Sequence, residues 1–129
     1  MIKFPQGFLY GSATSASQSE GAASLDGKSE NTWDFWYKKD PYKFHDLIGP
    51  EETTDIYHNY EKDVDLLEKT GHSVFRTSIS WTRLIPTIDG EVNPKAVEFY
   101  RDYFSKIKEK NITLYINLFH FDMPMYLMD

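Results

Sequence analysis

Apolar residues recur every three or four positions in two stretches of the chain, which is the spacing of a helix that buries one face. The first stretch begins after Asp55, a residue type that caps helices, and ends before Gly71. The second begins with Asn93 as its cap and Pro94 in the first turn, and continues to Asn111. The sequence therefore predicts two amphipathic helices, with apolar faces formed by Ile56, Tyr60, Val64 and Leu67 in the first and by Val97, Tyr100, Phe104 and Ile107 in the second.

Apolar and polar residues alternate in other stretches, as they do in β-strands. Residues 74–86 predict one strand, closed by Pro86, and residues 112–119 predict another with an aliphatic face. A further strand is predicted where an apolar run begins at Phe8 and is followed by small and polar residues. At the end of this strand, Gly11 allows a backbone or a ligand to approach closely.

The predicted elements follow one another as strand, long loop, helix, strand, helix, strand. Residues 22–54 show no sustained period, although a short helix is expected around residues 33–38. Strands that alternate with helices indicate an α/β fold with a parallel sheet and right-handed crossovers. Three strands leave open sheet edges, through which we expect the chain to self-associate.

Arg76 is unusual in the alternating stretch because a buried cation needs acceptors. If the stretch is extended, Arg76 shares a face with Ser78 and Ser80, whereas most residues of the other face are apolar. This polar face predicts a site in which carboxylates or other acceptors converge on Arg76. The alternative is a structural ion pair of Arg76 at the end of the sheet.

Two polar residues follow predicted strands at the carboxyl ends, where parallel sheets place their sites. Gln18 follows the first strand, and its amide can both donate to and accept from neighbouring hydroxyls. His120 follows the last strand and can donate from a ring nitrogen, provided that the strand ends before it, because strict alternation would put it on the aliphatic face. The alternatives are an ordinary loop glutamine and a histidine bonded to backbone.

Length and composition narrow the class of protein. The 129 residues fit one ordinary domain, and the 16% aromatic content suits either a dense core or a surface that stacks on sugar rings. A net charge of -6 with scattered Lys and Arg argues against a nucleic acid or an anionic membrane as partner. The N-terminus has no apolar signal core and no apolar run approaches the roughly 20 residues of a membrane span, so the expected location is the cytoplasm.

The patterns of several other kinds of site do not occur in the sequence. There is no cysteine, and the four histidines lie in unrelated settings, so no metal site is expected. There is also no glycine-rich phosphate loop and no serine in a Gly-x-Ser-x-Gly turn. We therefore expect neither a metal nor a cofactor.

Four motifs occur in order along the chain. Residues 4–22 read Phe-Pro-x-Gly-Phe-Leu-Tyr-Gly-x-Ala-Thr-Ser-Ala-x-Gln-x-Glu-Gly-Ala, and Trp33-Asp34 follows. Residues 75–86 read Phe-Arg-x-Ser-Ile-Ser-Trp-x-Arg-Leu-x-Pro, and residues 120–124 read His-x-Asp-x-Pro. In this order and spacing, the motifs resemble the N-terminal quarter to third of a family 1 glycoside hydrolase.

The resemblance implies a (β/α)8 barrel, of which residues 1–129 form an N-terminal fragment with about three βα units. It implies retaining hydrolysis of a small-molecule β-glycoside by two glutamates, one the acid/base and one the nucleophile. Gln18 and His120 are then expected to hydrogen-bond sugar hydroxyls, and Arg76 to lie beneath the nucleophile and keep it ionised and oriented. Phe121, where members that act on plain glucosides usually have Trp, implies a substrate contact and the bacterial branch that cleaves 6-phospho-β-glucosides or 6-phospho-β-galactosides.

The sequence departs from the family pattern at the two glutamates. Neither the Asn-Glu motif of the acid/base nor the Glu-Asn-Gly motif of the nucleophile occurs in the 129 residues, and Glu30-Asn31 matches by chance. Because retaining chemistry needs two carboxyl groups roughly 5 Å apart, the chain alone is expected to be inactive and to hold only part of the sugar pocket. The alternatives are a non-catalytic carbohydrate-binding or interaction module, and one half of a split enzyme completed by a second polypeptide.

Overall fold

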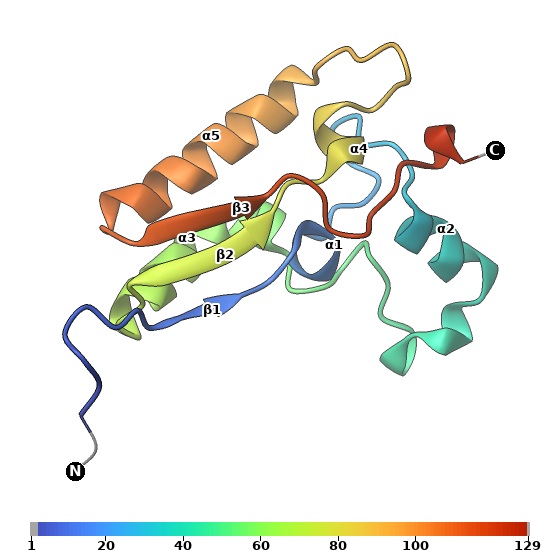
Figure 1. The fold of residues 1–129 in the computed structure, drawn as a ribbon. Helices are drawn as coiled ribbons and strands as arrows, with labels where there is room; N and C mark the ends of the chain where they lie inside the picture. The colour runs from blue at the N-terminus through green and yellow to red at the C-terminus, as the bar shows by residue number, and fades with distance from the viewer. Residues whose placement is uncertain (1–2, 129) are drawn as a thin grey trace.

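A computed structural model describes residues 3–128, in which helices and strands alternate along the chain (Figure 1). Within that range the strands are β1 (Gly11–Ala13), β2 (Val74–Ser78) and β3 (Thr113–Asn117). The α-helices are α1 (Ala16–Ser19), α2 (Thr32–Lys39), α3 (Ile56–Lys69), α4 (Trp81–Leu84) and α5 (Pro94–Glu109). Short 3-10 helices are η1 (Pro41–Lys43), η2 (His45–Leu47) and η3 (Met125–Leu127).

The described strands form one parallel sheet in the order β1-β2-β3, as the alternation of elements predicts. Gly11 pairs with Val74 in the register, and a β-carbon at Gly11 would lie only 1.9 Å from the Val74 carbonyl oxygen. Glycine is therefore required by the close approach of β2, which confirms the reading of this position. The strands point the same way, and α1, α2 and α4 gather beyond their carboxyl ends (Figure 1).

The apolar core lies between the sheet and helices α3 and α5. Val64 of α3 and Ile107 of α5 are almost completely buried in it, together with Phe75 of β2 and Ile112 just before β3. The face predicted for α3 is the face that packs. On α5 the predicted Tyr100 and Ile107 are buried and Phe104 packs against the core, but Val97 lies outside it, and the rest of the packed face is formed by Ala96, Phe99 and Tyr103. The structure confirms both amphipathic helices.

The helix caps agree with the sequence at one helix and differ at the other. The side chain of Asn93 accepts from the Lys95 N–H at 3.1 Å, with Pro94 in the first turn, as predicted. Asp55 does precede α3, but it has a left-handed backbone with φ of 52° and its carboxylate accepts no backbone N–H of the helix. The carboxylate contacts Nδ1 of His58 at 2.7 Å instead, so the predicted capping bond is wrong while the helix is right.

The second strand is shorter than the sequence predicts. It ends at Ser78, and α4 follows where the alternation indicated strand up to Pro86. The N–H of Ser80 donates to the Tyr100 hydroxyl at 2.7 Å rather than to a neighbouring strand, and the helical turn that follows buries Arg83. The alternating pattern therefore covers two different elements.

The ends of the other elements also correct the predictions. The first strand is limited to β1 and does not include the apolar run that begins at Phe8, and α1 follows where no helix was predicted. The expected short helix around residues 33–38 is confirmed as α2, and β3 ends at Asn117 rather than at Phe119. Among residues 3–128, no helix combines the length and the apolar character that crossing a membrane requires.

Candidate functional site

A cavity of about 530 Å³ opens beyond the carboxyl ends of the strands. Its lining brings together three residues that the sequence singled out, Gln18, His120 and Phe121. These residues come from segments about 100 positions apart, which only the parallel sheet places side by side. The rest of the lining is largely aromatic and aliphatic and includes Trp33, Phe44 and Ile48.

Gln18 reaches the cavity from α1, the single helical turn that follows β1. Its Oε1 accepts from the Ser15 hydroxyl at 2.7 Å, which leaves the amide NH₂ for a ligand. The start of α1 is tied to the end of β2, because the Ala16 N–H donates to the Ser78 hydroxyl at 2.8 Å. The position of Gln18 is thus set by the sheet.

His120 and Phe121 lie in a turn after β3, which ends early enough to free His120 from the aliphatic face as the sequence analysis required. Phe121 has a φ of 66°, a strained conformation for a bulky residue. The turn is held from outside, because Thr32 donates its N–H to the Met123 carbonyl at 2.9 Å and its hydroxyl to the Phe121 carbonyl at 3.3 Å. As a result, the Phe121 ring is 73% exposed and lies edge to face with His120, 5.1 Å between centroids.

Trp33 lines the cavity from the first turn of α2. From the sequence it was noted only as part of a motif, and no function was predicted for it. A capping box fixes this turn: the side chain of Asn31 accepts from the N–H groups of Trp33 and Asp34 at 2.9 Å, and Asp34 accepts from the Asn31 N–H at 3.0 Å. The ring of Trp33 lies 5.5 Å from that of Trp36. The lining of the cavity therefore includes an aromatic surface on which a flat ligand can stack.

The surroundings of Arg76 differ from the expectation. Arg76 is half-buried, and its Nη1 donates to the Thr14 carbonyl at 2.8 Å, so an acceptor is present but it is a backbone oxygen. Among residues 3–128, Arg76 forms no salt bridge, and it is not part of the cavity lining. Of the predicted carboxylates or other acceptors, the described residues supply only this backbone carbonyl, and they do not form the alternative structural ion pair.

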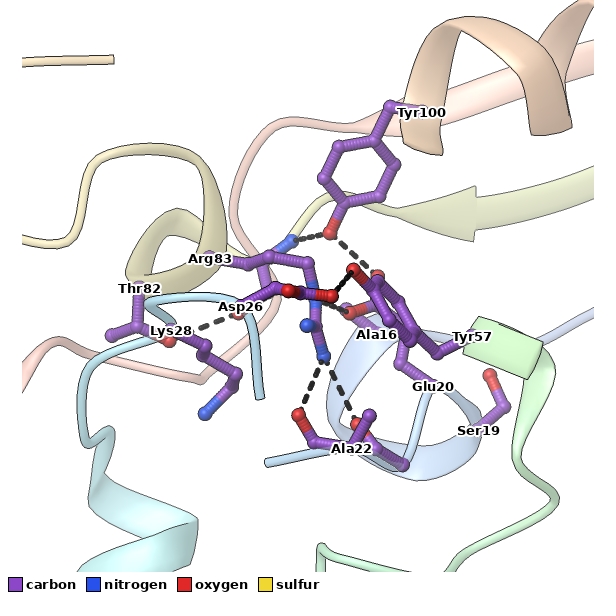
Figure 2. A network of polar contacts seen from close by, with 12 residues as sticks. Ala16, Ser19, Glu20, Ala22, Asp26, Lys28, Tyr57, Thr82, Arg83 and Tyr100 are labelled. Atoms are coloured by element: carbon purple, nitrogen blue, oxygen red, sulfur yellow. Dashed lines mark hydrogen bonds and ion pairs between the residues drawn. The ribbon is translucent and has the colours of Figure 1, made fainter. Parts of the chain in front are cut away.

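One buried ion pair of the fold belongs to Arg83, for which no role was predicted from the sequence (Figure 2). Arg83 has no exposed surface, and its Nε donates to Oε2 of Glu20 at 2.9 Å. Its Nη2 donates to the carbonyls of Gly21 and Ala22, and the ring of Tyr57 covers the guanidinium at 4.2 Å. The one feature of the sequence that could have indicated a buried Arg83 is that apolar residues follow it in the stretch that ends at Pro86.

Tyr100 completes this buried network from α5. Its hydroxyl donates to Oε1 of Glu20 at 2.6 Å and accepts from the Ser80 N–H at 2.7 Å (Figure 2). Burial, followed by the charge of Glu20, raises the pKa of Tyr100 well above its ordinary value, so the hydroxyl stays protonated and keeps donating.

Asp122 is a second buried carboxyl group close to the cavity. It has no exposed surface, and its Oδ2 has no hydrogen-bond partner among the described residues. Its Oδ1 accepts from the His120 N–H at 3.4 Å. Burial raises the pKa of Asp122 to about 6, an effect that hydrogen bonds from backbone N–H groups only partly offset.

The chemistry offered by the cavity is that of hydrogen bonding and stacking. In the part of the chain that the structure describes, no group of three or more His, Cys, Asp and Glu could hold a metal ion. An amide, an imidazole and aromatic rings around one cavity suit a ligand with hydroxyl groups on a flat apolar frame, such as a sugar ring.

Known sequences relate this chain to one enzyme family. The profile described as glycosyl hydrolase family 1 matches residues 1–129. The 6-phospho-beta-glucosidase GmuD of Bacillus subtilis (strain 168) is 49% identical over 125 residues, which are 97% of this chain and 27% of GmuD. Beta-glucosidase 3 of Arabidopsis thaliana is 44% identical over 98% of this chain and 24% of its own length. The chain thus spans about a quarter of the length of these relatives.

Solved structures agree with the sequence relatives. Aphid myrosinase superposes with a TM-score of 0.92 at 31% identity, over 98% of this chain and 28% of that protein. The family fold is a (β/α)8 barrel, and the three parallel strands with their crossover helices follow its βα alternation. The chain belongs to glycosyl hydrolase family 1.

Proposed function

We propose that this chain forms part of the sugar-binding pocket of a retaining β-glycosidase. The observation that carries the proposal is the meeting of Gln18 and His120 at one cavity beyond the carboxyl ends of the strands. Barrel enzymes of this architecture place their sites at that end of the sheet. In this proposal the two polar side chains bind sugar hydroxyls, Phe121 contacts the substrate, and Arg76 supports the nucleophile from β2.

We further propose a 6-phospho-β-glucoside as the substrate. The support is the identity of 49% to a protein named 6-phospho-beta-glucosidase, together with Phe at position 121. A substrate that is phosphorylated on entry into a cell would be cleaved in the cytoplasm, which is the location we propose. An identity of 44% to a plant beta-glucosidase makes the plain glucoside the competing substrate to test.

The 129 residues alone are proposed to be inactive, because neither glutamate motif of the family occurs in them. We propose that they are an N-terminal part of one barrel domain, completed by further strands. Ile116 and Leu118 on and after β3 are exposed, so the isolated chain should self-associate, which sedimentation analysis would detect.

The test begins with the intact mass of the natural gene product from its source cells. That product and the 129-residue chain are then assayed on an aryl 6-phospho-β-glucoside and on the plain aryl β-glucoside. We expect hydrolysis only by the longer form, with higher kcat/KM for the phosphorylated substrate. Specific hydrolysis by the 129-residue chain, or equal kcat/KM for both substrates, would contradict the corresponding part of the proposal.

Two substitutions test the pocket itself. Gln18→Ala and His120→Ala should each lower kcat/KM about 100-fold, because each removes a hydrogen bond to the sugar in a desolvated site. Gln6→Ala and His58→Ala, at exposed positions away from the cavity, are the matched controls and should leave kcat/KM unchanged. Equal effects of the test and control substitutions on kcat/KM would show that the cavity is not part of the active site.

A carbohydrate-binding role without catalysis is the second candidate, because residues of this chain alone line the cavity. It predicts that a natural product of about 15 kDa binds a β-glycoside and quenches the fluorescence of Trp33. One half of a split enzyme is the related alternative. It predicts that activity appears when a second polypeptide carrying the two glutamate motifs is added.

A further inference from the structure

The single turn of α1 has two different sides. Gln18 lines the cavity, whereas Glu20, at the C-terminal end of the turn, is only 5% exposed and belongs to the buried network. Residues two positions apart in a helix point about 200° away from each other, so a rotation of the turn moves both side chains together. A helix of one turn is not stable by itself, and contacts with the rest of the protein must therefore set its orientation.

Both ends of α1 are fixed by hydroxyl groups from other elements. At the start, the Ser78 hydroxyl at the end of β2 accepts from the Ala16 N–H at 2.8 Å. At the end, the Tyr100 hydroxyl of α5 donates to Oε1 of Glu20 at 2.6 Å (Figure 2). Both hydroxyl groups come from buried residues, where water cannot replace a lost bond.

The Tyr100 hydroxyl is itself held in one orientation. It accepts from the Ser80 N–H at 2.7 Å, so its proton is directed toward Glu20. The second oxygen of Glu20 accepts from Arg83 Nε at 2.9 Å, which fixes the carboxylate from the other side. The path from α5 to the helical turn that carries Gln18 therefore consists of short hydrogen bonds between buried groups.

We propose that Tyr100 and Ser78 are positioning residues for Gln18. Neither residue lines the cavity, but they fix the two ends of α1 and so set where the Gln18 amide meets the sugar. This inference rests on the proposed role of Gln18 in sugar binding. It extends the site from the cavity lining to two buried hydroxyl groups beneath it.

The test is a double-mutant cycle in the natural gene product, with Tyr100→Phe and Gln18→Ala and with kcat/KM for the aryl 6-phospho-β-glucoside as readout. We expect Tyr100→Phe alone to lower kcat/KM about tenfold, because a displaced amide binds the transition state less well. When Gln18→Ala is already present, the same change should lower kcat/KM by less than about twofold. A purely structural role would give the same loss in both backgrounds.

Tyr103→Phe is the matched control. Tyr103 lies one turn along the same helix and is equally buried, but its hydroxyl makes no hydrogen bond to a described residue. This variant should keep kcat/KM within about twofold of the wild type. If Tyr100→Phe does not fold, Ser78→Ala enters the same cycle with the same expectation.

The outcomes separate this inference from the proposed function. A loss of equal size with and without Gln18, or no loss at all in Tyr100→Phe, would overturn the positioning role alone. An unchanged kcat/KM in Gln18→Ala would overturn the role of Gln18 in the proposed function, and the positioning role with it.

Discussion

Arg76 and Arg83 lie in the same motif, yet their surroundings differ. Arg83 has no exposed surface and makes three hydrogen bonds, one of them to the carboxylate of Glu20. Arg76 is half-buried and, among the described residues, donates only to the carbonyl of Thr14. The first is held as part of the fold, whereas the second keeps free donors near the carboxyl end of its strand.

The difference bears on the role proposed for Arg76. The Arg83 guanidinium is fully buried and its charge is already paired with Glu20, so a further carboxylate cannot reach Nη1, its one nitrogen without a partner among the described residues. A half-buried guanidinium with spare donors can hold a carboxylate supplied from elsewhere. In the proposed enzyme that carboxylate is the nucleophile.

The largest expected effect is a loss of stability when the carboxylate partner of Arg83 is removed. Glu20→Ala leaves the Arg83 charge buried without its partner, which should lower the free energy of unfolding by about 3–5 kcal/mol. Glu30→Ala, which removes an exposed pair with Lys38, is the control and should cost less than about 1 kcal/mol. Urea denaturation of the natural gene product measures both, and equal midpoints for the two variants would contradict the structural role of the Glu20–Arg83 pair.

The second prediction concerns the effect of Arg76 on turnover. Arg76→Met should lower kcat about 100-fold with a much smaller change in KM, because the guanidinium acts on the nucleophile rather than on substrate binding. Stability should change little, since the side chain makes one hydrogen bond to backbone. Arg101→Met, an exposed arginine of α5, is the control for the same substitution. An unchanged kcat in Arg76→Met would remove Arg76 from the site.

The third and smallest effect concerns Asp122, a buried carboxyl group that, unlike Glu20, forms no ion pair with a described residue. Because burial raises the pKa of Asp122 to about 6, the folded state binds more protons than the unfolded state between about pH 4 and pH 6. Its contribution to stability therefore falls as pH rises through both pKa values, by about 3 kcal/mol in all.

Asp122→Asn removes that titration. We therefore expect the variant to gain stability relative to the wild type as pH rises. Urea midpoints from pH 4 to pH 7 measure this difference. Asp89→Asn, in an exposed turn, is the matched control and should leave the difference flat. A flat difference for Asp122→Asn as well would show that this carboxyl group is not buried in the folded protein.

Much of the fold follows from local pattern. The spacing of Val64 and Ile107 with their neighbours predicted both packed helices, and the alternation of elements predicted the parallel sheet. Gln18, His120 and Phe121 were placed at the carboxyl ends of strands by their positions in the sequence, and they do line one cavity. These features depend on residues close together in the chain, where periodicity carries the information.

Only the tertiary structure decided where the polar groups find their partners. Three features depend on contacts between residues far apart in the chain: the helical turn that follows β2, the burial of Arg83 rather than Arg76, and the position of Trp33 at the cavity. One such contact is the bond of Arg83 to Glu20, 63 residues away. The sequence by itself determined the three strands, the two long helices, their order and the resemblance to the family, but not α1 or α4. The pairing of buried charges across the sheet was decided in three dimensions, because desolvation makes such charges depend on their exact neighbours and no local period encodes these neighbours.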